Sequence, residues 1–259
     1  MRCCSPRRGE AIRRLGAGAL AVALAGCAGC ATRERPELRP ALSFREWSRR
    51  RASFSEIRGA IEAQRPYALR VRASIREPRT GHAFEARGAV AVSPHRAARL
   101  VLVGPGGGTA IDAWVTPMRW RLAIPPVDFV RRGGTDTDAA HGLPVGFFRW
   151  WFLAPFDGAL IMSDAVDTPR FAILRDGRAT VEMFVGVSDG KALVSAVRRE
   201  AGAIERLQWW GSSGGPGEGD RAVYVQEPSG LRVDVDVEGV GGEPEPEAFA
   251  DPDAAGAGS

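Results

Sequence analysis

The sequence predicts a mainly β protein of the α+β class, in which two helices cover the inner face of one curved antiparallel sheet. From Tyr67 onward most segments alternate apolar and polar residues, the pattern of strands that keep one face in water. Asp176-Gly177 and Asp189-Gly190 separate such segments and are typical of tight hairpins. Apolar residues at helical spacing occur in only two places, so strands must make up most of the fold.

Composition and charge narrow the class of protein. The chain has 259 residues, of which 44% are hydrophobic and 25% charged, which excludes a disordered or fibrous protein. All four cysteines lie in the first thirty residues, so the later domain has no disulfide framework and no cysteine metal site. Without residues 1–26 the chain carries 30 basic and 30 acidic residues. This balance argues against a nucleic-acid-binding protein, which needs a basic surface.

The N-terminus has the pattern of an export signal. Arg13 and Arg14 precede the uncharged stretch from Leu15 to Gly26, which is shorter than the roughly 20 residues that cross a bilayer. It ends in Leu24-Ala25-Gly26-Cys27 and resembles a bacterial lipoprotein signal, in which cleavage precedes a lipid-modified cysteine. We therefore predict a lipoprotein signal peptide over residues 1–26 and lipid attachment at Cys27. Two or three acyl chains would hold the protein stably on a membrane.

A second interpretation of this stretch is an ordinary cleavage site at Ala23-Leu24-Ala25, which would leave a protein free in the periplasm. Residues 27–42 contain Pro36 and Pro40 and are predicted to form the lipid anchor and a tether.

A helix is predicted from Ser43 until just before Pro66. Ser43 and Glu46, like Ser53 and Glu56, have the spacing of a capping box. One face of this helix is apolar, with Trp47, Phe54, Ile57 and Ile61.

The predicted strands follow the helix and continue almost to the end of the chain. The first begins at Tyr67, and its inward positions are Leu69, Val71, Ala73 and Ile75. The others are expected at Ala83–Val92, Arg99–Val103, Ala110–Thr116, Met118–Ile124, Phe171–Arg175, Ala179–Val187, Ala192–Arg198, Ile204–Trp210, Ala222–Gln226 and Leu231–Val237. Residues 43–240 are therefore predicted to be one domain.

Charged residues line the water-facing sides of the first and last strands. Arg70, Arg72 and Arg76 lie on the first, and Asp234 and Asp236 lie on the last. If these two strands are neighbours, the charges would pair across the sheet, at roughly 0–1 kcal/mol per pair.

A second helix interrupts the strands from Gly146 to Leu153. Phe147, Phe148, Trp150, Trp151 and Phe152 form an almost continuous run of bulky apolar residues, so this helix must lie against the sheet. The tail, residues 241–259, is rich in Glu, Asp and Pro, then in Ala and Gly. It is predicted to be an acidic disordered tail.

The sequence contains no recognisable catalytic, cofactor or metal site. His82, His95 and His141 are far apart in turn-like stretches. The glycine-rich stretch from Gly104 to Gly108 lacks a following Gly-Lys-Ser/Thr, and the next segment alternates like a strand, so it is interpreted as a strand connection rather than a phosphate loop. We therefore expect no enzyme, no cofactor and no bound metal.

The large apolar content suggests a binding function. Seven tryptophans are present, and several fall on predicted sheet faces or in the Phe147–Phe152 helix. A single curved sheet with only two covering helices often cannot fill its inner face, and the remaining space becomes a cavity for an apolar ligand.

Two stretches resemble the LolB family of outer-membrane lipoprotein receptors, in the wider LolA-like lipoprotein-localisation superfamily. The first is Arg99-Leu-Val-Leu-Val-Gly-Pro-Gly-Gly-Gly-Thr-Ala-Ile-Asp112, followed by a strand ending Leu122-Ala-Ile124. The second is Gly142-Leu-Pro-Val-Gly-Phe-Phe-Arg-Trp-Trp-Phe-Leu-Ala-Pro155, which is similar to that family's inserted helix. The resemblance implies an unclosed antiparallel half-barrel covered by an N-terminal helix and an inserted helix on its concave face.

The resemblance also implies a function. In that family the apolar inside of the half-barrel accepts acyl chains of lipoproteins delivered by LolA, a soluble carrier, without a covalent step. Ala28 after Cys27 suggests outer-membrane sorting by the same analogy. The family's exposed loop that reaches the membrane corresponds here to Pro105, Gly106 and Gly107, where glycine replaces leucine.

We therefore expect a lipid-anchored, periplasm-facing monomer at the outer membrane that binds lipoprotein acyl chains or another lipid, with no nucleic-acid partner. The alternative is an anchored structural or envelope-assembly protein with a filled core. The apolar residues expected to face the ligand, from strand alternation, are Leu69, Val71, Leu100, Leu102, Trp120, Leu122, Ile124, Phe147 and Trp151.

Overall fold

The fold is described from a computed structural model of the chain. The chain divides into two units, Met1–Leu42 and Ser43–Ser259. The described residues are 42–78, 80–134, 141–164, 169–175, 177, 179–200, 202–213, 215–227 and 229–254. The expected signal peptide, lipid-bearing Cys27 and most of the tether therefore lie outside the described residues. Among the residues described, no helix is both long and apolar enough to cross a bilayer.

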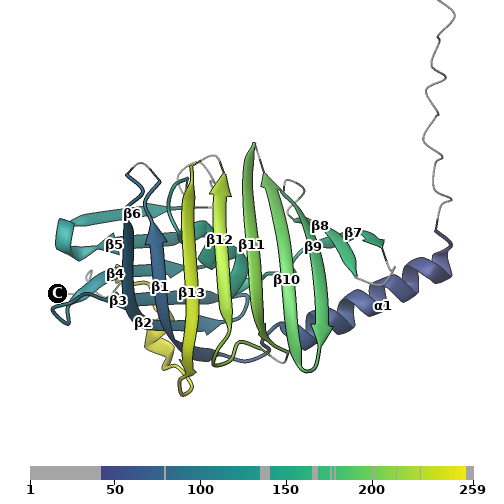
Figure 1. Ribbon diagram of the computed structural model, residues 1–259, viewed down its shortest axis with the longest axis horizontal. Helices are drawn as coiled ribbons and strands as arrows, with labels where there is room; N and C mark the ends of the chain where they lie inside the picture. Colours follow the sequence, from purple (N-terminus) through teal and green to yellow (C-terminus); the bar gives the residue numbers. More distant parts are fainter. Residues whose placement is uncertain are drawn as a thin grey trace, which may run out of the picture. The chain divides into compact units, whose positions relative to one another are not determined.

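In the part of the chain that the structure describes, thirteen strands form one sheet in which all neighbours are antiparallel (Figure 1). In chain order the strands are β1 Tyr67–Arg76, β2 Ala83–Ser93, β3 Ala97–Val103, β4 Thr109–Val115, β5 Trp120–Ile124, β6 Phe129–Gly133, β7 Ala159–Asp164, β8 Arg170–Arg175, β9 Ala179–Ser188, β10 Lys191–Glu200, β11 Ala203–Ser212, β12 Arg221–Glu227 and β13 Leu231–Val240. Their order in the sheet is β6-β5-β4-β3-β2-β1-β13-β12-β11-β10-β9-β8-β7. Because β6 and β7 end the sheet and do not pair, the half-barrel is open. The predicted mainly β, unclosed antiparallel fold is confirmed.

The sheet consists of two meanders that meet at β1 and β13. The first runs from β1 outward to β6, and the second runs from β7 inward to β13. The pairing β1–β13 places Arg72 opposite Asp236 and Ser74 opposite Asp234, so the condition set for the two charged rows is met and the first and last strands are neighbours. Arg72 itself pairs with Glu85 on β2, while Arg221 on β12 pairs with Asp234 and Asp236.

The connection between the two meanders must cross the sheet. It leaves β6 at one edge and enters β7 at the opposite edge. It contains the predicted helix as α2 (Val145–Phe147), which continues as the π-helical turn η3 (Phe148–Leu153). We call residues 141–154 of this connection the insert, and the face of the sheet that it covers the inner face.

The helix α1 (Phe44–Ile61) begins as its capping box predicts. Ser43 Oγ accepts a hydrogen bond from the Glu46 amide at 3.2 Å. Phe54, which is buried, packs on Phe171 of β8 at a ring-centroid distance of 5.0 Å. This helix therefore covers the sheet near β8, away from the central strands.

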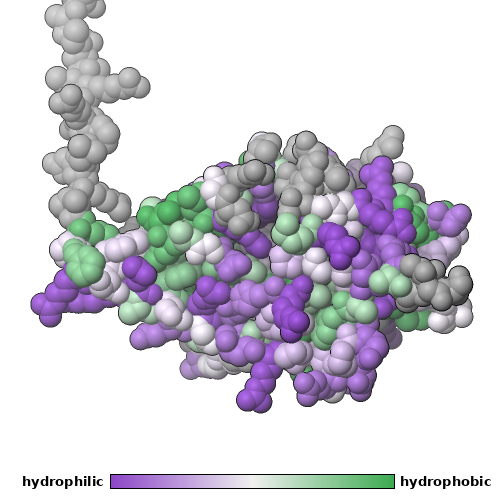
Figure 2. All heavy atoms as spheres, turned by 180° about the vertical axis from the view of Figure 1, so that it is seen from behind, coloured by the Kyte–Doolittle hydropathy of each residue, from purple (hydrophilic) through white to green (hydrophobic). Residues whose placement is uncertain are grey.

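The two edge strands β6 and β7 are absent from the sequence prediction. β7 leaves Ile161 51% exposed and Met162 39% exposed. Apolar surface gathers in Figure 2 at the end of the domain where Figure 1 draws α1 and β7.

The expectation of a disordered tail is wrong for residues 241–254. The 3-10 turn η4 (Pro246–Phe249) packs beside β2 and β3. The Trp114 indole N–H donates to the Phe249 carbonyl at 3.0 Å. Arginines of the sheet bind Asp251 and Asp253. The tail is ordered because its carboxylates meet these arginines; residues 255–259 lie outside the described part.

Candidate functional site

The candidate site is the inner face of the sheet beneath the insert. Every residue expected to face a ligand reaches this region. Leu69, Val71, Leu100, Leu102, Trp120 and Leu122 come from β1, β3 and β5 and are at most 2% exposed. Phe147 and Trp151 come from the insert, and Ile124 is half-buried and packs against the same cluster. Strand alternation therefore identified residues that lie in one continuous apolar region. Ligand binding at this region is a proposal.

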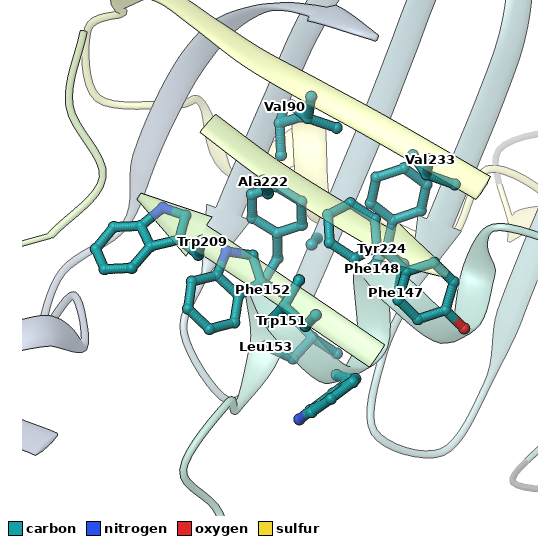
Figure 3. Packing of buried hydrophobic residues seen from close by; sticks show 14 of the residues in the cluster. Val90, Phe147, Phe148, Trp151, Phe152, Leu153, Trp209, Ala222, Tyr224 and Val233 are labelled. Atoms are coloured by element: carbon teal, nitrogen blue, oxygen red, sulfur yellow. The ribbon is translucent and has the colours of Figure 1, made fainter. Parts of the chain in front are cut away.

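The insert fills this face with large side chains (Figure 3). The Phe147 ring lies 5.2 Å from the Tyr224 ring of β12, and the Trp151 ring lies 5.2 Å from the Trp209 ring of β11. A helical segment this short is marginal in water by itself, and π-helical turns are rare. The conformation of the insert is therefore maintained by its packing on the sheet.

The sheet leaves room for the insert because many of its inward residues are small. Buried alanines of this face include Ala73, Ala98, Ala113, Ala196 and Ala222. They lie across β1, β3, β4, β10 and β12, and Trp151 and Phe152 of the insert line the same small hollow as Ala222.

Among the described residues, hydrogen bonds join the insert to the sheet and its loops at several points, including one from the Arg175 guanidinium of β8 to the Ala154 carbonyl at 3.3 Å. The Gly142 amide donates to Gln226 Oε1 at 2.7 Å, and the His95 amide donates to the Leu153 carbonyl at 2.8 Å. The Arg149 guanidinium donates to the Pro117 carbonyl at 2.6 Å and to the Gly134 carbonyl at 3.2 Å. These contacts lie around the insert, whereas its aromatic centre is held by apolar contacts.

The hollows on the inner face that are lined by described residues are much smaller than the cavity expected from the sequence. One hollow beside Trp151, Phe152 and Trp209 has a volume of about 30 Å³, and another beside Leu69 and Trp151 has about 10 Å³. Ligand pockets usually measure several hundred Å³, so neither accommodates an acyl chain. The physical reason is the topology, because the connection from one sheet edge to the other carries its aromatic residues across the inner face.

Trp120 is an unusual member of the inner face. Its indole ring lies against Gly133 of β6, where a Cβ would come within 2.6 Å of the ring nitrogen. The residue is 2% exposed, and its Nε1 has no hydrogen-bond partner in the described part of the chain. An unpaired buried donor costs roughly 1–3 kcal/mol, so an acceptor reaching this atom would bind favourably.

A buried polar network lies under the start of the insert, and sequence reasoning missed it. Tyr224 donates its hydroxyl to Glu205 Oε1 at 2.6 Å, and Arg198 binds Glu205 Oε2 at 2.5 Å. Burial, followed by the nearby Glu205 charge, raises the pKa of Tyr224 well above its usual value. Strand alternation could have flagged Glu205, because it shares the inward positions of Leu207 and Trp209.

The loop expected to face a membrane is an exposed turn between β3 and β4. Pro105, Gly106 and Gly107 are all exposed, and the Gly104 amide donates to the Gly108 carbonyl at 2.9 Å. Gly107 has a φ of +77°, which favours glycine. The predicted strand connection is confirmed here.

A larger hollow lies outside the inner face. It has a volume of about 450 Å³ and is lined by residues that include Leu193 of β10 and Trp210 of β11. Leu193 and Trp210 are opposite each other in the sheet and are 45% and 39% exposed. This hollow is open, so it provides a second apolar surface that binding experiments must separate from the inner face.

In the described residues, no group of three or more His, Cys, Asp or Glu side chains could hold a metal ion.

Together, these features define an open antiparallel half-barrel whose inner face is closed by a helical connection. No protein-family model matches the sequence, and the search of curated proteins found no match.

Solved structures with a similar course of the chain include a LolA superfamily protein from Nitrosomonas europaea, with 10% identity, a TM-score of 0.46 and coverage of 79% of this chain and 98% of that one. A domain described as an outer membrane lipoprotein-sorting protein from Vibrio parahaemolyticus has 8% identity, a TM-score of 0.46 and coverage of 75% and 93%. A DUF1329 family protein from Desulfovibrio piger has 10% identity, a TM-score of 0.42 and coverage of 80% and 96%. The likeness concerns the fold alone.

Proposed function

We propose that this protein is a lipid-anchored envelope lipoprotein that binds an acyl chain on the inner face of its open sheet, by displacing the insert. The observation that carries the proposal is that a separate connecting segment, rather than the sheet's own side chains, fills this face. The inward alanines leave space, and the insert occupies it with Phe147, Phe148, Trp150, Trp151, Phe152 and Leu153.

The energies make such an exchange feasible. Each large buried side chain of the insert contributes about 1.5–3 kcal/mol by burial, or on the order of 10 kcal/mol for the six together. An acyl chain of about 16 carbons contributes a similar amount, at roughly 0.8 kcal/mol per methylene. Because the two terms are comparable, the exchange of the insert for an acyl chain leaves only a small free-energy difference between the two end states.

Trp120 supports an oxygen-bearing lipid as the ligand. Its unpaired Nε1 lies within the apolar inner face and could donate to the carbonyl of an ester or amide that links an acyl chain to glycerol or protein. Such a contact would remove the cost of the unpaired donor.

The further parts of the proposal concern place and partners. Lipid attachment at Cys27 would hold the protein at the outer membrane, facing the periplasm. The acyl chains would be those of other lipoproteins, presented by a soluble LolA-like carrier. No catalytic or cofactor-dependent step is needed, because relative affinity for the acyl chain would drive transfer.

The first test measures binding of a fluorescent fatty acid to the Ser43–Ser259 unit, which contains the whole hydrophobic core. Displacement by palmitate is the readout. Ile124→Glu is expected to weaken binding about tenfold or more, because a charge at the end of β5 must then lie beside the acyl chain. Ile124 is half-buried, so this variant is expected to fold. Leu122→Glu, at a fully buried position, should have a larger effect.

Leu193→Glu is the matched control, since it places the same charge beside the hollow on β10 and β11. Equal binding by Leu193→Glu and the parent chain supports the inner face as the site. If Leu193→Glu weakens binding and Ile124→Glu does not, the ligand occupies the outer hollow and the proposal is wrong. If the parent chain binds no fatty acid, the protein is better explained by the alternative, an anchored structural protein with a filled core. The small volumes of the hollows around the insert are the observation that supports this alternative.

Depletion of the protein in its own cell separates a receptor from a general lipid binder. A receptor's loss should cause other lipoproteins to accumulate away from the outer membrane, as measured by membrane fractionation. A Cys27→Ser variant should fail to restore their distribution. An unchanged distribution after depletion would contradict the receptor role while leaving acyl binding intact.

A further inference from the structure

The acidic tail lies on the outer face of β4, β5 and β6, opposite the insert. The outward residues of these strands are identified by their pairing, in which Trp114 is opposite Arg121, and Arg121 is opposite Arg132. Arg119 binds Asp251 at 3.2 Å, Arg121 binds Asp253 at 3.0 Å, and Arg132 also binds Asp253. Three arginines thus converge on two carboxylates.

These ion pairs are suited to exchange. The side chains of Arg119 and Arg132 are 66% and 59% exposed, and that of Asp253 is 37% exposed, whereas Arg121 is 17% exposed and also binds Asp112 of β4 at 3.4 Å. Exposed ion pairs are weak and are screened by salt. Hydrogen bonds from Arg132, followed by the charges of Arg132 and Arg121, lower the pKa of Asp253, so this carboxylate is ionised at neutral pH. The tail is therefore held by contacts that another set of anions can replace.

The tail covers a surface with the composition of a membrane-interface site. Trp114 is only 4% exposed, and its indole N–H is bonded to the Phe249 carbonyl of the tail. The Arg119 guanidinium lies 5.7 Å from the centre of the Trp114 ring. At the same edge, Met118 is 66% exposed and Val130 is 41% exposed. Tryptophan, arginine and exposed apolar side chains together are typical of surfaces that bind at the headgroup level of a bilayer.

We propose that the outer face of β4–β6, with Trp114, Arg119, Arg121 and Arg132, binds an anionic phospholipid surface, and that the acidic tail occupies this face until lipid phosphates replace Asp251 and Asp253. The tail acts as a competing anion carried by the same chain. This proposal does not depend on acyl-chain binding, which concerns the opposite face of the sheet.

The test compares two double variants of the Ser43–Ser259 unit that change net charge equally. Asp251→Asn/Asp253→Asn removes the two carboxylates that bind the arginines. Glu243→Gln/Glu245→Gln removes two tail carboxylates that are exposed and form no ion pair among the described residues. Each variant is sedimented with vesicles of phosphatidylglycerol and phosphatidylcholine, and with vesicles of phosphatidylcholine alone.

Asp251→Asn/Asp253→Asn is expected to bind the anionic vesicles at about tenfold lower lipid concentration than the parent chain, since each arginine released near an anionic surface adds to the attraction. Glu243→Gln/Glu245→Gln should change binding by less than about threefold. Adding Arg121→Gln/Arg132→Gln to the first variant should abolish its gain, and raised salt should weaken it.

Three results would overturn the proposal. Equal gains in the two double variants would show a general effect of net charge. Equal binding to phosphatidylcholine alone would show that phosphate charge is not recognised. No gain in Asp251→Asn/Asp253→Asn, with a circular dichroism spectrum matching that of the parent chain, would show that the tail covers no membrane-binding face.

Discussion

The Glu205→Leu variant is expected to unfold with a free energy about 3–5 kcal/mol lower than that of the parent chain. The substitution removes one of the two carboxylates that bind the largely buried Arg198 guanidinium, the other being Glu200, and it removes the acceptor of the Tyr224 hydroxyl. Removing one partner of a buried ion pair costs more than the pair itself contributes, because the remaining charge stays desolvated. Urea unfolding of the Ser43–Ser259 unit, followed by circular dichroism, measures the loss.

Two further variants test whether the loss of stability in Glu205→Leu comes from the buried ion pair. Adding Arg198→Met and Glu200→Gln to Glu205→Leu should recover most of the lost stability, since neither Arg198 nor Glu200 then remains as a largely buried unpaired charge. Glu227→Leu removes the partner of Arg206 in an exposed pair, whose side chains are 52% and 44% exposed, and should cost under about 1 kcal/mol. A loss in Glu205→Leu no larger than that in Glu227→Leu would contradict a stabilising role for the buried network.

Phe147→Ala is expected to lower the unfolding free energy by about 3–5 kcal/mol and to strengthen binding of a fluorescent fatty acid. Phe147 is fully buried between Phe148, Phe152 and Tyr224. Its truncation leaves an apolar void on the inner face that an acyl chain can enter without displacing the whole insert. Added palmitate should therefore restore part of the lost thermal stability.

Phe156→Ala is the matched control for this prediction. Phe156 is equally buried, but its ring packs edge-on against Phe54 of α1 at 6.3 Å. Phe156→Ala should lower the free energy of unfolding by a similar amount and leave the affinity for the fatty acid unchanged. If both variants lose stability and neither gains affinity, the space under the insert is structural only, which would contradict the proposed function.

The strands that sequence reasoning predicted are those with two neighbours in the sheet. β1, β5 and β13 alternate clearly because one face of each is buried. β6 has only five residues, Phe-Val-Arg-Arg-Gly, and β7 reads Ala-Leu-Ile-Met-Ser-Asp without alternation. Both are edge strands, which bury less of each face. Their sequences therefore contain little of the pattern that identifies a strand.

The site was predictable to the extent that it depends on alternation along one strand. Leu69, Leu100 and Leu122 reach the inner face because each occupies an inward position. Contacts between distant segments were not predictable in this way. The bond between Trp114 and Phe249 joins residues 135 apart, and no local pattern in the tail indicates that its carboxylates meet arginines of the sheet.

The seam between β1 and β13 also affects how the molecule reaches its folded state. Each meander is built from hairpins of neighbouring strands, whereas the seam pairs Ile75 with Val233 and Ala73 with Val235. Pairings between residues so distant in sequence carry a large loop-closure entropy and form slowly. A chain that is synthesised from its N-terminus can assemble the β1–β6 half early, with the edge of β1 left uncovered. That edge is covered only when the last strand arrives, and until then it is the surface most exposed to aggregation and most in need of a chaperone.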